Sequence, residues 1–188
     1  MINHTSTYAR DSRALYQEWC GYLVSGDTSR EVSLALVGPP RSGKTGLAAG
    51  VEAFLGRENV ARTTPSQLTR GFGLKQLVGK FAAIVEGGNF TAASTTALCR
   101  INTGDSPATG CRVMILANDI PTFAGADAPT VEEQLLVVHT WGQVPDDPGF
   151  AARLASERSG ILNWALDGLD RLNRNGDFTR PQMPVRVA

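Results

Sequence analysis

The sequence lacks the features that would place it in a membrane, secreted or strongly basic class of protein. No apolar stretch among its 188 residues is long enough for a signal peptide or a membrane span. Lys and Arg together number 18, as do Asp and Glu, and this zero net charge argues against a strongly basic nucleic-acid-binding protein. It leaves room for local basic patches or for a positive channel made by several subunits. We therefore expect a cytoplasmic protein that does not bind membranes.

Cysteine and histidine are also scarce. The three cysteines, Cys20, Cys99 and Cys111, are odd in number and scattered, which favours reduced thiols in the cytoplasm. There is no C-x-x-C pair, and His4 lies far along the chain from His139. A zinc site is therefore not expected.

A phosphate-binding loop is the most informative motif that the chain does contain. The segment LALVGPPRSGKT, residues 34–45, is an apolar run followed by the G-x-x-x-x-G-K-[ST] pattern at full spacing. Gly38 and Gly43 allow backbone N–H groups to approach a phosphate chain, and Lys44 offers a charge to its β- and γ-phosphates. Thr45 offers a hydroxyl to Mg²⁺, and the helix that begins at Lys44 points its positive end at the same anion. The predicted nucleotide-binding residues are Gly38, Pro39, Pro40, Arg41, Ser42, Gly43, Lys44 and Thr45.

The rest of the chain alternates apolar runs with helical patterns, which indicates a parallel α/β sheet. The apolar content of 42% is sufficient for one sizeable domain. We expect a three-layer P-loop NTPase fold of the AAA+ type, with a parallel central sheet and a small C-terminal helical segment. The expected strands are 34–37, 60–63, 81–85, 112–117 and 135–139.

The predicted domain organisation is simple. Residues 1–12 are expected to be a flexible N-terminal segment, 13–180 a single ATPase-like domain and 181–188 a flexible tail. Asp11 or Ser12 is a candidate cap for the first helix. The last predicted helix, 161–172, has a continuous apolar face.

Two polar residues follow expected strands and are candidates for catalysis. Glu86 ends one strand and would hold Mg²⁺ through water or orient the attacking water, although a solvated carboxylate at a strand end is the simpler alternative. Asn118 ends another and would contact the γ-phosphate or that water, although asparagine is also a common turn residue. The predicted catalytic residues are therefore Lys44, Glu86 and Asn118. The predicted metal contacts are Thr45 and Glu86.

The ordered motifs resemble those of a known family. The stretches LYQEWCGYLVSG, LALVGPPRSGKT, GLKQLVGKFAAIVE, VMILANDIP and SGILNWALDGLDRLNRNGDFTRP are similar to the superfamily 3 helicase domain of phage and plasmid primase–helicases, over about residues 14–181. The resemblance implies an AAA+ type ATPase, ATP with Mg²⁺, a hexameric ring and 3′-to-5′ unwinding of DNA. It also places the family's strand-end acid at Glu86 and its sensor asparagine at Asn118.

The chain departs from the family in three places. Residues 105–112 leave room for only a short loop where relatives have a basic, aromatic hairpin that grips single-stranded DNA. Residues 131–135 contain no arginine to reach a neighbouring subunit's ATP, an interaction that stabilises the transition state. A primase domain precedes the helicase domain in the family, whereas this sequence starts almost at its first helix.

Other side chains have simpler interpretations. Arg112, Arg153 and Arg158 are candidates to approach a phosphate or a neighbour, but solvated surface charge is the expected state. Trp19 and Trp164 are expected to be core aromatics rather than base-stacking platforms.

Three functional hypotheses follow. The first is an ATP-hydrolysing, helicase-like protein of phage or mobile-element DNA replication, with single-stranded DNA as a possible ligand. The second is an ATP-binding assembly or regulatory protein with reduced hydrolysis, which forms a ring or joins a partner helicase or replication protein. The third, a small P-loop kinase, is disfavoured because no arginine-rich lid segment is visible.

Overall fold

The protein, described here from a computed structural model covering residues 4–108 and 110–181, is built around a five-stranded parallel sheet. Residues 1–3 and 182–188, parts of the two predicted flexible ends, lie outside the described residues. The helices are α1 (His4–Ser25), α2 (Lys44–Leu55), η1 (Arg57–Asn59), α3 (Pro65–Leu68), α4 (Gly71–Lys75), α5 (Ala92–Asn102), α6 (Ala128–Glu133), α7 (Phe150–Ser156) and α8 (Arg158–Asn175). The strands are β1 (Ser33–Val37), β2 (Val60–Thr63), β3 (Ala82–Glu86), β4 (Asn89–Phe90), β5 (Arg112–Ala117), β6 (Thr122–Phe123) and β7 (Leu135–His139).

The large sheet has the strand order β2-β3-β5-β1-β7, with every neighbouring pair parallel. All five predicted strands are confirmed, and three of them have the predicted bounds. Strand β1 lies between β5 and β7, so the chain leaves the sheet after β1 beside the ends of both neighbours. This topology places the segment after Val37 next to the segments after Ala117 and His139.

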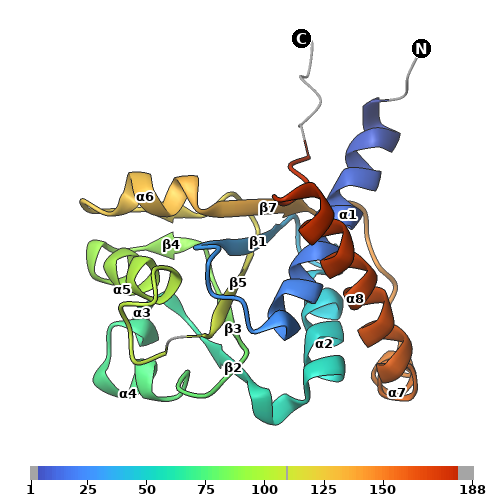
Figure 1. Ribbon diagram of the computed structural model, residues 1–188, viewed down its shortest axis with the longest axis horizontal. Helices are drawn as coiled ribbons and strands as arrows, with labels where there is room; N and C mark the ends of the chain where they lie inside the picture. The colour runs from blue at the N-terminus through green and yellow to red at the C-terminus, as the bar shows by residue number, and fades with distance from the viewer. Residues whose placement is uncertain (1–3, 109, 182–188) are drawn as a thin grey trace.

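Helices cover both faces of the sheet, which gives the predicted three-layer α/β fold (Figure 1). The strand side chains alternate between two cores, as the pleat of a sheet requires. Leu34, Ile84 and Met114 face the core shared with α1, α2 and α8. Ala35 and Ile115 face the core shared with α3 and α5.

The first and last helices lie against one another because two glycines remove the side chains that would keep them apart. A Cβ atom on Gly21 of α1 would lie 2.3 Å from the Ala165 carbonyl oxygen, and one on Gly168 of α8 would lie 2.4 Å from that of Gln17. Both distances are too short for any side chain, and the atoms that would be struck belong to the backbone. The α1–α8 pair therefore depends on glycine on each side of the contact.

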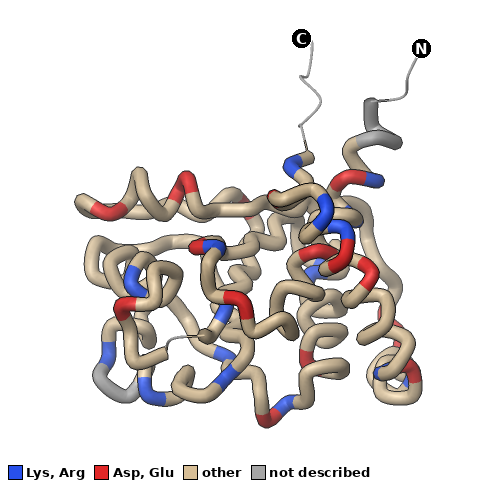
Figure 2. Tube along the Cα trace, viewed as in Figure 1, with Lys and Arg blue, Asp and Glu red and all other residues tan. Residues whose placement is uncertain are grey.

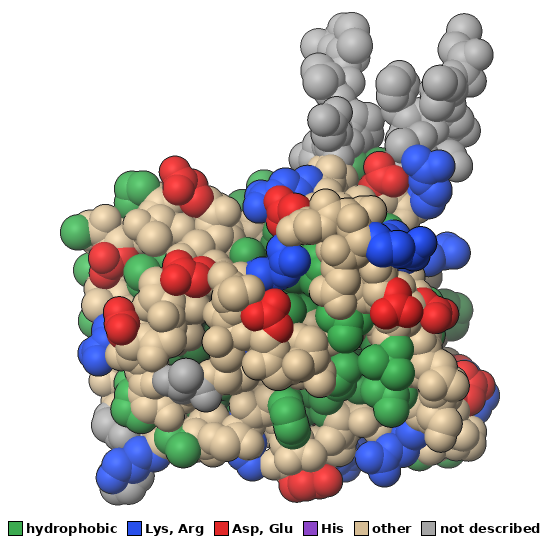
Figure 3. Space-filling view, viewed as in Figure 1, with side chains coloured by type: hydrophobic (Ala, Val, Ile, Leu, Met, Phe, Trp, Pro, Cys, Tyr) green, Lys and Arg blue, Asp and Glu red, His purple; other side chains and the backbone are tan. Residues whose placement is uncertain are grey.

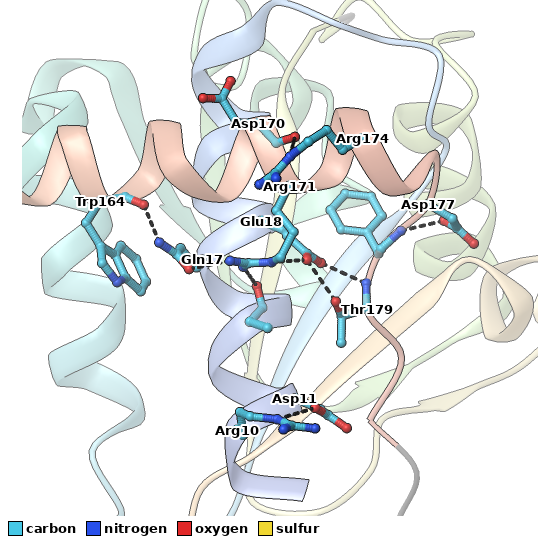
Figure 4. Close-up of polar contacts among 12 residues, drawn as sticks. Arg10, Asp11, Gln17, Glu18, Trp164, Asp170, Arg171, Arg174, Asp177 and Thr179 are labelled. Carbon is cyan, nitrogen blue, oxygen red and sulfur yellow. Dashed lines mark hydrogen bonds and ion pairs between the residues drawn. The ribbon is translucent and has the colours of Figure 1, made fainter. Parts of the chain in front are cut away.

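A buried carboxylate fastens this helix pair at one end. Glu18 is fully buried, and its Oε1 accepts a hydrogen bond from Arg171 Nε at 2.6 Å. Thr179, beyond α8, donates its backbone N–H at 2.7 Å and its hydroxyl at 2.8 Å to the same carboxylate (Figure 4). Arg171 also donates to Gln17 and to the Ala14 carbonyl. Because the buried charge has its partners, it fixes the register of α1 against α8 without an uncompensated desolvation cost.

Three local features differ from the expectations. Helix α1 begins at His4, earlier than the predicted cap at Asp11 or Ser12. A short helix, α6, begins within residues 120–129, a stretch whose glycine and proline content favours a loop, and Pro129 lies near its first turn, where a missing N–H costs nothing. Strands β4 and β6 form a two-residue parallel pair that no sequence pattern indicated.

The structure describes the state of the cysteines and the apolarity of the helices. All three cysteines are free, and burial raises the pKa of Cys20 and of Cys111 to about 12, which keeps both thiols protonated at neutral pH. In the described part of the chain, no helix combines the length and apolarity needed to cross a membrane.

The glycine contact gives a stability prediction. Gly168→Ala should lower the free energy of unfolding by about 1–3 kcal/mol, because the new methyl group must push α1 and α8 apart. The matched control is Gly160→Ala in the same helix, where a Cβ would meet nothing within 4 Å. That change should stabilise the protein by up to about 1 kcal/mol, since alanine is the better helix former. Urea unfolding of both variants measures the difference, and equal midpoints would show that the close contact does not limit stability.

Candidate functional site

The predicted phosphate-binding loop joins β1 to α2 and is packed against the end of β7. A Cβ atom on Gly38 would lie 2.2 Å from the Thr140 carbonyl oxygen, so only glycine fits there. The Thr140 N–H donates to the Val37 carbonyl at 2.7 Å, and its hydroxyl lies 2.6 Å from that of Ser42. The loop is therefore held by Thr140, the residue after β7, which lies 98 positions beyond Ser42 in the sequence.

The N-terminus of α2 has no side-chain cap. Gly43 precedes the helix with φ of 95°. The first N–H groups of a helix have no intrahelical acceptor, and the helix dipole adds positive potential at the same point. A phosphate group placed here would supply the missing acceptors.

Lys44 lies across this loop and joins it to a neighbouring strand. Its ammonium group donates to the Gly38 carbonyl, to the Pro39 carbonyl at 2.9 Å and to Asn118 Oδ1 at 3.3 Å. Burial lowers the pKa of Lys44 from its usual value. Phosphate oxygens would oppose that shift, because they favour the charged form of the lysine.

The remaining loop residues differ in exposure. Pro39, Pro40, Arg41 and Thr45 are exposed, whereas Ser42 is buried. Arg41 has a φ of 64°, in the left-handed region, and its carbonyl accepts the Val144 N–H at 2.8 Å. The segment after β7 thus closes over the loop from one side.

The two candidate strand-end residues have different surroundings. Asn118, directly after β5, contacts Lys44 and also lines a cavity of about 340 Å³ at the carboxyl ends of β3 and β5. Glu86, the last residue of β3, instead binds Arg62 of β2, with Oε1 2.7 Å from Nη1. The structure therefore brings Asn118 together with Lys44, while Glu86 is held in an ion pair at the neighbouring strand.

Arg62 is shared between two carboxylates. Its Nε donates to Glu52 of α2 at 2.7 Å, and Nη1 donates to Glu86 at the same distance. The hydrogen bond that Arg62 donates to Glu52 is the largest cause of the raised pKa of Arg62, and Glu86 contributes further. Glu52 has only 15% of its side chain exposed, against 55% for Glu86, so the Glu52 contact is the better shielded of the two.

The donor set suits a magnesium nucleotide better than a metal held by protein alone. Among the residues described, no group of three or more His, Cys, Asp or Glu side chains lies close enough to hold a metal ion. Mg²⁺ in nucleotide sites takes most of its ligands from phosphates and water, with few from the protein. The uncapped N-terminus of α2 beside Lys44 fits such a phosphate-borne ion, and Thr45 and Glu86 are the predicted protein contacts.

Sequence analysis missed the contributions of Arg62, Thr140 and Val144. The position of Thr140 and Val144 could have been inferred from the topology, because a strand that pairs in parallel with β1 ends beside the phosphate loop. No pattern indicated the pairing of Arg62 with Glu86, because it depends on the register of β2 against β3.

The secondary candidates have varied outcomes. Arg112 is buried rather than solvated: it donates to the Asp27 carbonyl and lies over the Tyr22 ring, 4.8 Å from its centroid. It starts β5, at the opposite end of the strand from Asn118. Arg153 is exposed and pairs with Asp147, and Arg158 is exposed at the start of α8. Trp19 is a fully buried core residue as predicted, whereas Trp164 both packs on the core and lines a cavity beside the phosphate loop.

Comparison with known proteins identifies a shared fold. No protein-family profile and no curated protein sequence matches the chain. Among solved structures it is similar to the C-terminal region of NrS-1 in two apo forms, with TM-scores of 0.64 and 0.60 and 13% identity. These matches cover 87% and 88% of this chain but only 45% and 47% of the NrS-1 chains, so it spans less than half of their length. At this identity the likeness shows a common fold.

Proposed function

We propose that the chain binds ATP with Mg²⁺ and hydrolyses it, as a superfamily 3 helicase-like protein of phage or mobile-element DNA replication. The observation that carries the proposal is the junction of Lys44 with Asn118, 3.3 Å apart at the carboxyl ends of β1 and β5. Ligands of parallel α/β sheets bind outside the carboxyl ends of the strands, and this is where the loop lies. The NrS-1 fold and the family resemblance of the motifs support the same assignment.

Each residue has a distinct part in the proposed reaction. Lys44 and the N-terminal N–H groups of α2 bind the phosphates and orient them, and Thr45 contacts the metal. Bound Mg²⁺ supplies charge neutralisation at the phosphate oxygens. Asn118 donates a hydrogen bond toward the γ-phosphate or the attacking water. Glu86, once its carboxylate leaves Arg62, orients that water and accepts its proton, as the water oxygen bonds to the γ-phosphorus and the bond from that phosphorus to the ADP oxygen breaks.

A second candidate function is an ATP-binding assembly or regulatory protein that hydrolyses ATP slowly and does not unwind DNA. The exposed end of α6 carries Glu132 and Glu133 in the region where members of the family that the motifs resemble have an arginine. The described part of the loop between α5 and β5 forms turns without a strand. Basic and acidic positions are interspersed over the described chain (Figure 2). These observations favour nucleotide binding over DNA unwinding, and the partners proposed are further copies of the chain or a partner helicase in the cytoplasm of the host cell.

Turnover distinguishes the two candidates. The measurement is the ATPase rate with and without single-stranded DNA, on a sample whose mass in solution is known. Strong stimulation by DNA would exclude the assembly-only function. Nucleotide binding without turnover, together with co-assembly with a helicase, would exclude the enzyme.

Substitution of the loop lysine tests nucleotide binding. Lys44→Ala should weaken ATP binding by about 10- to 100-fold and remove turnover, because hydrogen bonds to charged groups contribute roughly 1.5–3 kcal/mol. The control is Lys80→Ala, a lysine whose ammonium group donates to the Glu58 carbonyl away from the loop. Calorimetric titration with Mg-ATP gives the affinities, and equal affinities for the two variants would contradict phosphate binding at residues 38–45.

The shared arginine provides a matched test of Glu86. Glu86→Gln should lower kcat by about 100-fold, since general-base catalysis contributes roughly that factor or more, while the Kd for ATP changes little. Glu52→Gln alters the other carboxylate bound to Arg62 and should leave kcat within about two-fold. Equal losses in both variants would mean that Glu86 acts only through Arg62 and would overturn its assignment as the base.

A further inference from the structure

A cavity beside the proposed ATP site extends well past the phosphate loop. It has a volume of about 1270 Å³, and residues 41–47 form only one end of it. The other walls come from α1, α2, the segment after β7, α7 and α8. A nucleotide whose phosphates bind the loop would therefore have its ribose and base within this cavity.

The charges along the cavity differ from one end to the other. Its only cationic lining residues in the described chain are Arg41 and Lys44, both at the phosphate loop. The lining carboxylates are Asp146 and Asp147, in the segment after β7, and Glu157, directly before α8; Asp147 is paired with Arg153. Carboxylates repel phosphate groups but accept hydrogen bonds from hydroxyl and amino groups. The segment after β7 lies beside the loop, whereas Glu157 lies on the α8 side, so a nucleotide with its phosphates at Lys44 would have its sugar and base toward α8.

The wall between the two ends is apolar and aromatic. Tyr16 of α1 and Trp164 of α8 line it with their ring centroids 6.0 Å apart, and Phe54 and Ile161 lie in the same wall. Hydrophobic side chains gather where α2 meets the first half of α8 (Figure 3). Flat apolar faces of this kind bind nucleobases by stacking.

Hydrogen bonds hold the Tyr16 ring and the backbone at Trp164 in place. The Tyr16 hydroxyl donates to the Leu47 carbonyl at 2.8 Å, which ties α1 to the first half of α2. Gln17 Nε2 donates to the Trp164 backbone carbonyl at 2.6 Å (Figure 4), and the Trp164 ring lies against the Tyr16 ring. The cavity wall is thus preorganised, so little side-chain ordering is needed on binding.

From this geometry we propose that the cavity between α2, α7 and α8 binds the base and ribose of the nucleotide, and that the base is a purine stacked on the Trp164 wall. A purine covers more aromatic surface than a pyrimidine, and its ribose and amino donors would face the carboxylates of Asp146 and Glu157. The inference rests on the proposed function, since it requires phosphates at Lys44.

Gly160 offers a way to block this pocket without disturbing the fold. It lines the cavity from α8, and a Cβ there would meet nothing within 4 Å. Gly160→Leu therefore places a side chain in open space and also improves the helix. The control is Ser159→Leu, which adds the same side chain at the preceding, exposed position outside the cavity lining.

The experiment titrates wild type and both variants with ATP, UTP and inorganic tripolyphosphate in the presence of Mg²⁺. Wild type should bind ATP about ten-fold more tightly than UTP or tripolyphosphate, as expected for one stacked base. Gly160→Leu should lose that advantage for ATP and keep its tripolyphosphate affinity within about two-fold, while Ser159→Leu should behave as wild type.

The outcomes separate this inference from the proposed function. If wild type binds ATP and tripolyphosphate equally and Gly160→Leu changes neither, the base pocket is wrong while phosphate binding stands. If wild type binds none of the three ligands, the proposed function fails and the base pocket fails with it.

Fluorescence provides an independent readout. ATP should quench tryptophan emission in wild type and in Trp141→Phe, since Trp141 is 57% exposed and does not line the cavity. The quenching should disappear in Trp164→Phe. Quenching that survives in Trp164→Phe would overturn the assignment of Trp164 as the stacking surface.

Discussion

The close contact between α1 and α8 is the constraint on which the rest of the molecule depends. Gly21 and Gly168 let the two helix backbones approach to distances that no side chain would allow, and the Glu18–Arg171 pair fixes their register. Helix α8 follows α7 after the single residue Glu157 and packs mainly on α1, with a smaller contact to α2. The position of Trp164 relative to α2 is consequently set through α1.

The phosphate loop depends on a comparable long-range contact. Gly38 lies against Thr140, and Val144 binds the Arg41 carbonyl, so β7 and its following segment shape a loop made by β1 and α2. Three parallel strands therefore contribute to one small region: β1 carries the loop, β5 supplies Asn118, and β7 supplies the support. A rigid sheet with functional residues at the ends of its strands holds such groups in place with little flexibility.

The sequence predicted those parts of the fold that depend on local chemistry. Apolar runs defined all five long strands, and the spacing of Gly38, Gly43 and Lys44 identified the loop. What it could not predict depends on register and tertiary packing. Arg112 was expected to be a surface charge, because its burial depends on contacts with distant residues. It packs on Tyr22 of α1 and donates to the Asp27 carbonyl in the turn after α1. The pairing of Arg62 with Glu52 and Glu86 requires three elements to be placed before it becomes visible.

The hydrogen bond from Gln17 to Trp164 joins residues 147 positions apart. Gln17 precedes all five strands of the large sheet in the sequence, and Trp164 follows them all. The ribosome completes the phosphate loop and its supporting strands well before α8 emerges, yet one wall of the adjoining cavity is made by α8. Contacts of such large sequence separation form late in folding, because they require closure of the longest loops. The nascent chain thus completes the loop at residues 38–45 first, and the enclosed aromatic wall only when α8 has docked.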